Sequence, residues 1–319
     1  MTYKIKHGLL FSAGLFIIVL MGTSCSKTPS GAQVSVPDIV LWSSVESDIV
    51  SVLSEEPNEC LSSHETVQDT QNIAFGRLAF RSSYLLGGQA ARRGLTCQAC
   101  HGQGQTNTHF FVTGLSSEPG TADVTSFHFS DKLGDEEFNP VPIPSLSDDI
   151  QGVDYDPLND DLESFVTRLI TKEFTGPEPS QDIKHVLLSY LRALDDKHCD
   201  TPTLSEQALL EYKIDVITES FAAILIKDAS QDTLNFMAAA LRQDIGRLHE
   251  RFPYQENLQN TLVAISQDLN AQGGTINLQS IEDGSKKWDA IREELSQYYA
   301  NSLFNPVIIR KWDRARHNN

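Results

Sequence analysis

The chain has 319 residues and a formal net charge of −18, because 43 acidic residues outnumber 25 Lys and Arg residues. So acidic a protein is not expected to bind nucleic acid or an anionic lipid surface, whose phosphates would repel it. The charge is suited to attracting a basic partner protein, or it serves only to keep the protein soluble.

Residues 1–24 have the pattern of a secretory signal peptide. Lys4 and Lys6 give a basic start, an apolar run covers 8–21, and small residues follow. The run is short for a membrane span and no comparable run occurs later, so we expect the mature chain to be soluble apart from any anchor. Loss of Lys4 and Lys6 would remove two positive charges and take the net charge from −18 to −20.

Cys25 is a candidate lipid attachment site. The residues around it resemble a bacterial lipoprotein signal, in which the cysteine becomes lipidated and N-terminal. Ser26, in place of Asp, favours the outer membrane of a bacterial cell envelope, with the protein facing the periplasm. Simple cleavage that leaves Cys25 as a free thiol stays open, because Gly22 stands where an aliphatic residue is usual. Residues 25–58 are predicted to form a lipid-anchored tether, with an irregular segment or a short helix around 39–53.

The segment Cys97-Gln98-Ala99-Cys100-His101 has the pattern Cys-x-x-Cys-His, which is the attachment site of a c-type haem. Thiols at this spacing can form thioethers with the two haem vinyl groups, and the histidine can bind the iron as proximal ligand. A redox dithiol would normally accompany a βαβ pattern, which is absent here, and zinc would need further ligands at a suitable spacing, whereas the sequence has no second Cys-x-x-Cys. We therefore predict one covalent haem c on Cys97, Cys100 and His101.

The two remaining cysteines, Cys60 and Cys199, flank the haem motif. We interpret them as a disulfide that ties together the two ends of one domain, because an exported protein folds in an oxidising compartment. Two separate buried thiols are the alternative.

Two further segments accompany the motif. Gly76-Arg77-Leu78-Ala79-Phe80 precedes it, and Tyr190-Leu191-Arg192-Ala193-Leu194 follows it. Segment 76–80, together with Leu95-Thr96 ahead of the motif, resembles one haem domain of the di-haem cytochrome c peroxidase family. Segment 190–194 is similar to the last helix of class I cytochrome c domains. The resemblance covers about 73–196 and implies an all-α, cytochrome c-like haem domain, which we place at 59–200.

Apolar residues at three- and four-residue steps predict a helix over 183–194. Gly76 lies in a second predicted helix and would let the two pack closely over the haem edge. Tyr190 would supply aromatic bulk there or serve as an ordinary core residue.

Residues 102–160 form a long segment rich in Gly, Pro, Ser and Asp. A loop of this length in a compact domain is usually functional, and in cytochromes this part covers the second haem face. We expect Phe110 and Phe111 to wall the haem pocket. Arg92 and Arg93 are candidates to pair with the haem propionates, unless they are simply solvated.

His128 is the predicted sixth iron ligand, which would give bis-histidine ligation. It follows His101 by 27 residues, enough chain to pass around the porphyrin edge. His109 leaves too little chain, and Met237 lies on an apolar stripe outside the cytochrome-like region, which favours a core residue. An open iron site, with His128 as a loop residue, is the other alternative.

Beyond residue 200, four apolar stripes at helical spacing predict a helical bundle over 201–303. Helix breaks are expected near 228–230, Pro253, 273–274 and Gly284. The tail 304–319 is basic and would dock on the acidic body or hang free.

These features predict a monohaem c-type cytochrome that carries single electrons to or from a redox partner protein, with no catalytic residue of its own. One alternative is a peroxidase-like haem enzyme, or a subunit acting with another haem protein. The resemblance implies a two-haem mechanism for such enzymes, which one motif cannot support within a single chain. The other alternative is a haem sensor or accessory protein that binds a partner through its bundle.

Overall fold

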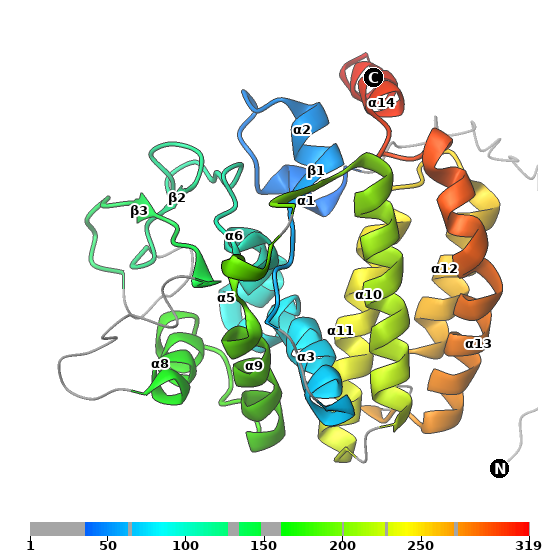
Figure 1. The fold of residues 1–319 in the computed structure, drawn as a ribbon. Coiled ribbons are helices and arrows are strands. Elements are labelled where there is room, and N and C mark those ends of the chain that lie inside the picture. Colours follow the sequence, from blue (N-terminus) through cyan, green and yellow to red (C-terminus); the bar gives the residue numbers. More distant parts are fainter. Residues whose placement is uncertain are drawn as a thin grey trace, which may run out of the picture. The chain divides into compact units, whose positions relative to one another are not determined.

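The structure is a computed structural model that describes residues 36–62, 66–126, 134–147, 161–199, 201–226, 229–270 and 274–318. Helices dominate these residues, and the strands are limited to two short antiparallel pairs (Figure 1). The fold is therefore mainly α-helical, as the sequence predicts. Within the described part of the chain, no helix is both long and apolar enough to cross a membrane.

Two helices that lie far apart in the sequence pack side by side at the centre of the N-terminal half (Figure 1). They are α3 (Val67–Phe80) and α9 (Gln181–Ala193). The hydroxyl group of Thr66 caps the start of α3, and that of Ser180 caps the start of α9, so a side-chain N-cap fixes the residue at which each helix begins. Gly76 lies at the crossing, where a side chain would collide with α9.

Short elements connect these two helices. After α3 come α4 (Ser83–Leu86), α5 (Gly88–Arg92), α6 (Cys97–Cys100) and the 3₁₀ turn η1 (Gly102–Gly104). The strands β2 (Thr121–Ala122) and β3 (Val141–Pro142) pair antiparallel, with Thr121 opposite Pro142. The helix α8 (Leu162–Arg168) continues into the π-helical turn η2 (Leu169–Glu173) before α9.

The C-terminal half contains the expected four-helix bundle. Its helices are α10 (Glu206–Ile226), α11 (Gln231–His249), α12 (Glu256–Asp268) and α13 (Leu278–Leu295). Each of them packs against two others, in the cyclic order α10, α11, α12 and α13, so the apolar stripes meet in one core. Most stripe residues are buried, among them Phe221, Leu241, Leu262 and Trp288.

Gly284 does not end a helix, so the predicted break at this position is wrong. It lies inside α13, and a Cβ atom there would be 3.5 Å from Cβ of Asp268 and 3.6 Å from the ring of Phe221. The glycine therefore serves close packing of α13 against α10 and α12, which outweighs its poor helix propensity.

The folded part of the chain begins earlier than the predicted domain boundary at 59. The short helical structure expected around 39–53 is present as α1 (Asp38–Leu41) and α2 (Ile49–Ser54), and β1 (Glu55–Pro57) follows. The last of these pairs antiparallel with β4 (Thr203–Ser205), with Glu56 opposite Leu204.

The basic tail is also folded, because most of it forms the helix α14 (Pro306–His317). This helix packs against α2, and a small apolar core between them contains Leu53, Leu303, Ile309 and Trp312. The charged side chains of Arg310, Lys311 and Arg314 stay exposed on the other side. Of the two alternatives, the tail is therefore docked and not free. The burial of its apolar side chains holds it in place.

The N-terminal and C-terminal halves are not separate domains. Helix α3 packs against both α10 and α11, and Val34–Asn319 form one compact unit. The predicted division at residue 200 therefore falls inside a single packed body, in which the bundle supports one face of α3.

Candidate functional site

The predicted haem-binding cysteines lie on one helical turn, α6. The hydroxyl oxygen of Thr96 accepts a hydrogen bond from the backbone N–H of Ala99 at 3.1 Å and caps its start. The N–H of His101 donates to the carbonyl oxygen of Cys97 at 2.8 Å and closes the turn. Because Cys97 and Cys100 are three residues apart in a helix, their side chains emerge on the same face.

A neighbouring segment fixes the orientation of the His101 imidazole. Its Nδ1 atom lies 3.0 Å from the carbonyl oxygen of Pro144. A carbonyl oxygen can only accept, so Nδ1 carries the proton and donates, and the lone pair lies on Nε2. Burial lowers the pKa of His101 to about 4, so the ring is neutral at physiological pH. The second nitrogen is thereby prepared to bind a metal ion.

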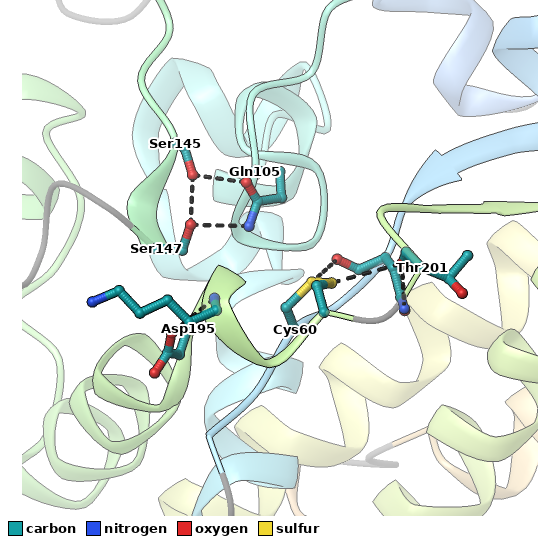
Figure 2. Close-up of a disulfide and its surroundings, with 9 residues drawn as sticks. Cys60, Gln105, Ser145, Ser147, Asp195 and Thr201 are labelled. Carbon is teal, nitrogen blue, oxygen red and sulfur yellow. Dashed lines mark hydrogen bonds between the residues drawn. A yellow bond between two sulfur atoms is a disulfide. The ribbon is translucent and has the colours of Figure 1, made fainter.

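The segment that carries Pro144 is itself held in place by hydrogen bonds to the residues after the motif. Ser145 Oγ donates to Gln105 Oε1 at 2.8 Å, and Gln105 Nε2 donates to Ser147 Oγ at 3.0 Å (Figure 2). Thr106 Oγ1 donates to the carbonyl oxygen of Ile143 at 2.8 Å. These contacts position the carbonyl of Pro144 against His101.

The thiols of Cys97 and Cys100 are both free. Burial raises the pKa of Cys97 to about 12 and also raises that of Cys100, so both are protonated thiols at neutral pH. Two free thiols on one face of a turn, followed by an imidazole with its Nε2 lone pair available, match the donor set that a c-type haem requires. The residues present therefore fit this group.

The structure shows where the other residues predicted to contact the haem lie. Arg92 and Arg93 are exposed at the end of α5. Phe110 is fully buried and stacks on Trp42, with ring centroids 6.3 Å apart. Phe111 is half-buried, and its N–H donates to the carbonyl oxygen of Trp42 at 2.9 Å. Both phenylalanines thus contact the N-terminal segment, and their predicted role in the haem pocket stays a prediction.

The three candidates for the predicted sixth iron ligand lie in different parts of the chain. His128 lies outside the described residues, as does Cys25, the predicted lipidation site. Met237 is fully buried in α11, within the core of the bundle. His109 Nε2 lies 3.4 Å from Ser51 Oγ and therefore faces α2. Among the described residues, no cluster of three metal-binding side chains is present.

Cys60 and Cys199 are joined by a disulfide, with their Cα atoms 5.2 Å apart (Figure 2). Next to it, the N–H of Asp195 donates to the carbonyl oxygen of Cys60 at 2.9 Å, and Leu61 pairs with Leu194. The bridge and these backbone bonds fasten the chain before α3 to the chain after α9. The disulfide thus links the two ends of the segment that begins with α3 and finishes with α9.

A buried charge cluster beside this helix pair was not predicted from the sequence. Glu59 forms two contacts with Arg77, at 2.6 and 2.9 Å, and accepts a hydrogen bond from the hydroxyl group of Tyr190 at 2.8 Å. Arg77 also contacts Glu219 of α10 at 2.7 Å. The position of Arg77 on the buried face of α3 is the signal that could have revealed it, since a buried arginine requires an acidic partner.

The geometry of Pro144 is the second feature that sequence reasoning missed. The three closely spaced prolines at 140, 142 and 144 were visible in the sequence, but only the fold brings one of their carbonyl groups to His101.

Comparisons with protein-family models, with curated proteins and with solved structures each gave no significant match to this chain.

Proposed function

We propose that this protein is a monohaem c-type cytochrome that transfers single electrons. One observation carries the proposal: the turn that holds two free thiols, Cys97 and Cys100, ends at an imidazole whose Nδ1–H is bound by the carbonyl of Pro144. This arrangement leaves Nε2 of His101 available to iron, and a redox dithiol would have no use for it.

The residues around the motif would each have a defined task. Cys97 and Cys100 would anchor the group covalently, and His101 would bind iron through Nε2. The bond to Pro144 would hold the ring in one orientation and increase its basicity, which favours the oxidised metal. Bound haem would supply an iron centre that takes up and releases one electron. The crossing of α3 and α9 at Gly76 adds support, because it agrees with the helix contact expected from the resemblance to cytochromes.

The proposal extends to the location of the protein and its partners. With a signal peptide at 1–24 and a lipid on Cys25, it would be an outer-membrane lipoprotein that faces the periplasm. Without Lys4 and Lys6 its net charge would be −20, which would favour a basic redox partner protein. A labelled fatty acid that is incorporated into wild type but not into Cys25→Ser would support the anchor.

A pyridine haemochrome assay on protein extracted with acidic acetone tests the covalent haem. The wild type should keep its pigment, with one haem for each chain, and Cys97→Ser/Cys100→Ser should lose it. The matched control is Cys60→Ser/Cys199→Ser, which also removes two cysteines and should keep the pigment. Pigment that leaves the wild type with the solvent would contradict the proposal.

The absorption spectrum separates electron transfer from the peroxidase alternative. A low-spin, six-coordinate haem that is reduced and reoxidised reversibly supports an electron carrier. A five-coordinate ferric haem together with turnover of hydrogen peroxide would instead assign the protein to the haem peroxidases, acting with a second haem protein.

A further inference from the structure

The exposed side of α14 carries three cations and no carboxylate. Between positions 306 and 314, the exposed residues are Val307, Arg310, Lys311 and Arg314. Steps of three and four residues place them on one side of the helix. We call these four residues the basic face.

The cations of the basic face have no carboxylate partner in the described part of the chain. The one acidic residue of α14 is Asp313, which contacts Arg316 Nε at 2.7 Å. Among the described residues, no carboxylate lies within ion-pair distance of Arg310, Lys311 or Arg314. Their charge is therefore available to an external anion.

Large apolar groups are exposed together with these cations. Val307 is 69% exposed. The ring of Tyr254, which is 41% exposed, has its centroid 5.2 Å from Lys311 Nζ. Cations that alternate with exposed apolar and aromatic side chains are typical of protein surfaces that lie on a bilayer, where Tyr rings sit at the level of the headgroups.

The opposite side of α14 fixes the basic face in position. Ile309 and Trp312 are fully buried, in the small core that they share with Leu53 of α2. Figure 1 shows α14 beside α2. The basic face thus belongs to a packed helix and needs no rearrangement to contact a flat surface.

The described chain begins close to α14. Ile39 and Val40 of α1 pack against the core between α2 and α14, and the first described residue is Val36. Cys25 precedes Val36 by eleven residues, so a lipid on Cys25 would keep Val36 within about 40 Å of the bilayer. Contact of α14 with that bilayer would then be intramolecular, and a weak attraction would suffice.

The negative charge of the whole chain does not prevent this contact. At physiological ionic strength the Debye length is about 8 Å, so a bilayer interacts mainly with the charges that face it. Each Lys or Arg close to an anionic bilayer contributes about fivefold in affinity. The repulsion expected from the net charge therefore applies to the acidic remainder of the surface and not to the basic face.

We propose that the basic face of α14 docks on the anionic phospholipid headgroups of the membrane that holds the lipid anchor. The three cations would lie at the level of the phosphates, and Val307 would reach below them. The inference rests on the proposed anchor, because the anchor is what brings a bilayer to α14. The contact would hold the folded body in one orientation at the membrane.

Co-sedimentation of the chain 26–319 with vesicles tests the basic face without the anchor. This chain contains the compact unit Val34–Asn319 and lacks Cys25, so the result does not depend on lipidation, which the labelled fatty acid tests separately. At about 0.1 M salt it should bind vesicles of phosphatidylglycerol and phosphatidylcholine in equal parts. It should bind vesicles of phosphatidylcholine alone at least about tenfold more weakly. Equal binding to the two kinds of vesicle, or no binding to either, would overturn the proposal.

Substitution of the three cations locates the contact. Arg310→Gln/Lys311→Gln/Arg314→Gln leaves the buried side of α14 unchanged and should weaken binding to the mixed vesicles by about tenfold or more. Raising the salt to about 1 M, where the Debye length is about 3 Å, should have a similar effect on the wild type. Binding that withstands both changes would show that the basic face does not contact the lipid.

The matched control removes three exposed cations from α8, η2 and α9, as Arg168→Gln/Lys172→Gln/Arg192→Gln. It changes the net charge equally and should bind like the wild type; equal losses in the two triple variants would overturn the proposal. Sedimentation velocity without vesicles examines the other occupant. If the wild type self-associates and the α14 variant stays monomeric, the basic face belongs to a contact with a second copy of the chain, and the membrane proposal is wrong.

Discussion

Gly76 of α3 lies directly against Tyr190 of α9: a Cβ atom at position 76 would be 2.5 Å from Cβ of Tyr190 and closer still to the carbonyl oxygen of Val186. Real Cβ atoms do not approach other atoms so closely, so only glycine allows the two helices to meet at this point. The ring of Tyr190 then fills the space beside the crossing, 5.3 Å from the ring centroid of Phe80.

Gly76→Ala should therefore destabilise the protein, although alanine is the better helix former. We expect a loss of about 2–3 kcal/mol in the free energy of unfolding, because the methyl group would force α3 and α9 apart. Urea denaturation followed by circular dichroism measures it. The control is Gly246→Ala in α11, where a Cβ atom meets nothing within 4 Å. That variant should gain up to about 1 kcal/mol; equal effects at both sites would show that the crossing is not tightly packed.

The sequence was sufficient for features that repeat along one helix or lie within one turn. The apolar spacing of 183–194 predicts α9, and four stripes predict the bundle, because both depend on local periodicity. It was not sufficient for partners brought together by the fold. The contact of Glu59 with Arg77 and that of Pro144 with His101 join segments 18 and 43 residues apart, and no local pattern encodes either.

The buried carboxylate of Glu59 should make stability depend on pH. Burial alone would raise its pKa, but Arg77, Arg81 and the hydrogen bonds from Arg77 and Tyr190 outweigh it and hold the pKa below the ordinary value of 4.5. A group whose pKa is depressed in the folded state stabilises the protein above its unfolded pKa. This contribution is lost as the pH falls from about 4.5 through the folded-state pKa.

Glu59→Gln should consequently lower the free energy of unfolding by about 3 kcal/mol at pH 7, because it leaves Arg77 buried without its closest partner. The difference from wild type should shrink as the pH falls below about 4.5. Urea denaturation between pH 7 and pH 3 measures this dependence. Glu219→Gln removes the other carboxylate from the same arginine, but its side chain is 51% exposed, so we expect at most about 1 kcal/mol. Equal losses in the two variants would contradict the role of burial.

The disulfide between Cys60 and Cys199 should be a major contribution to stability, because it closes a loop with a sequence separation of 139 residues. In the chain-entropy model, so long a loop corresponds to about 5 kcal/mol. Peptide mapping without reduction should recover the linked pair from protein purified under oxidising conditions. Cys60→Ser/Cys199→Ser should unfold at lower urea concentration than wild type, and reduced wild type should resemble the variant. Two free thiols at these positions in native protein would refute the pairing.

If the protein binds haem as we propose, separate substitutions of His128 and Met237 would assign the sixth iron ligand. If His128 binds the iron, His128→Ala should convert a low-spin ferric spectrum into a high-spin one, because a weak ligand or none replaces an imidazole. Met237 is fully buried in the bundle core, on α11, so Met237→Leu should keep the low-spin spectrum and cost less than about 1.5 kcal/mol in stability. A folded Met237→Leu variant that becomes high-spin would reverse this assignment. A high-spin wild type would mean that neither side chain binds, and the iron would then have an open position suited to peroxide.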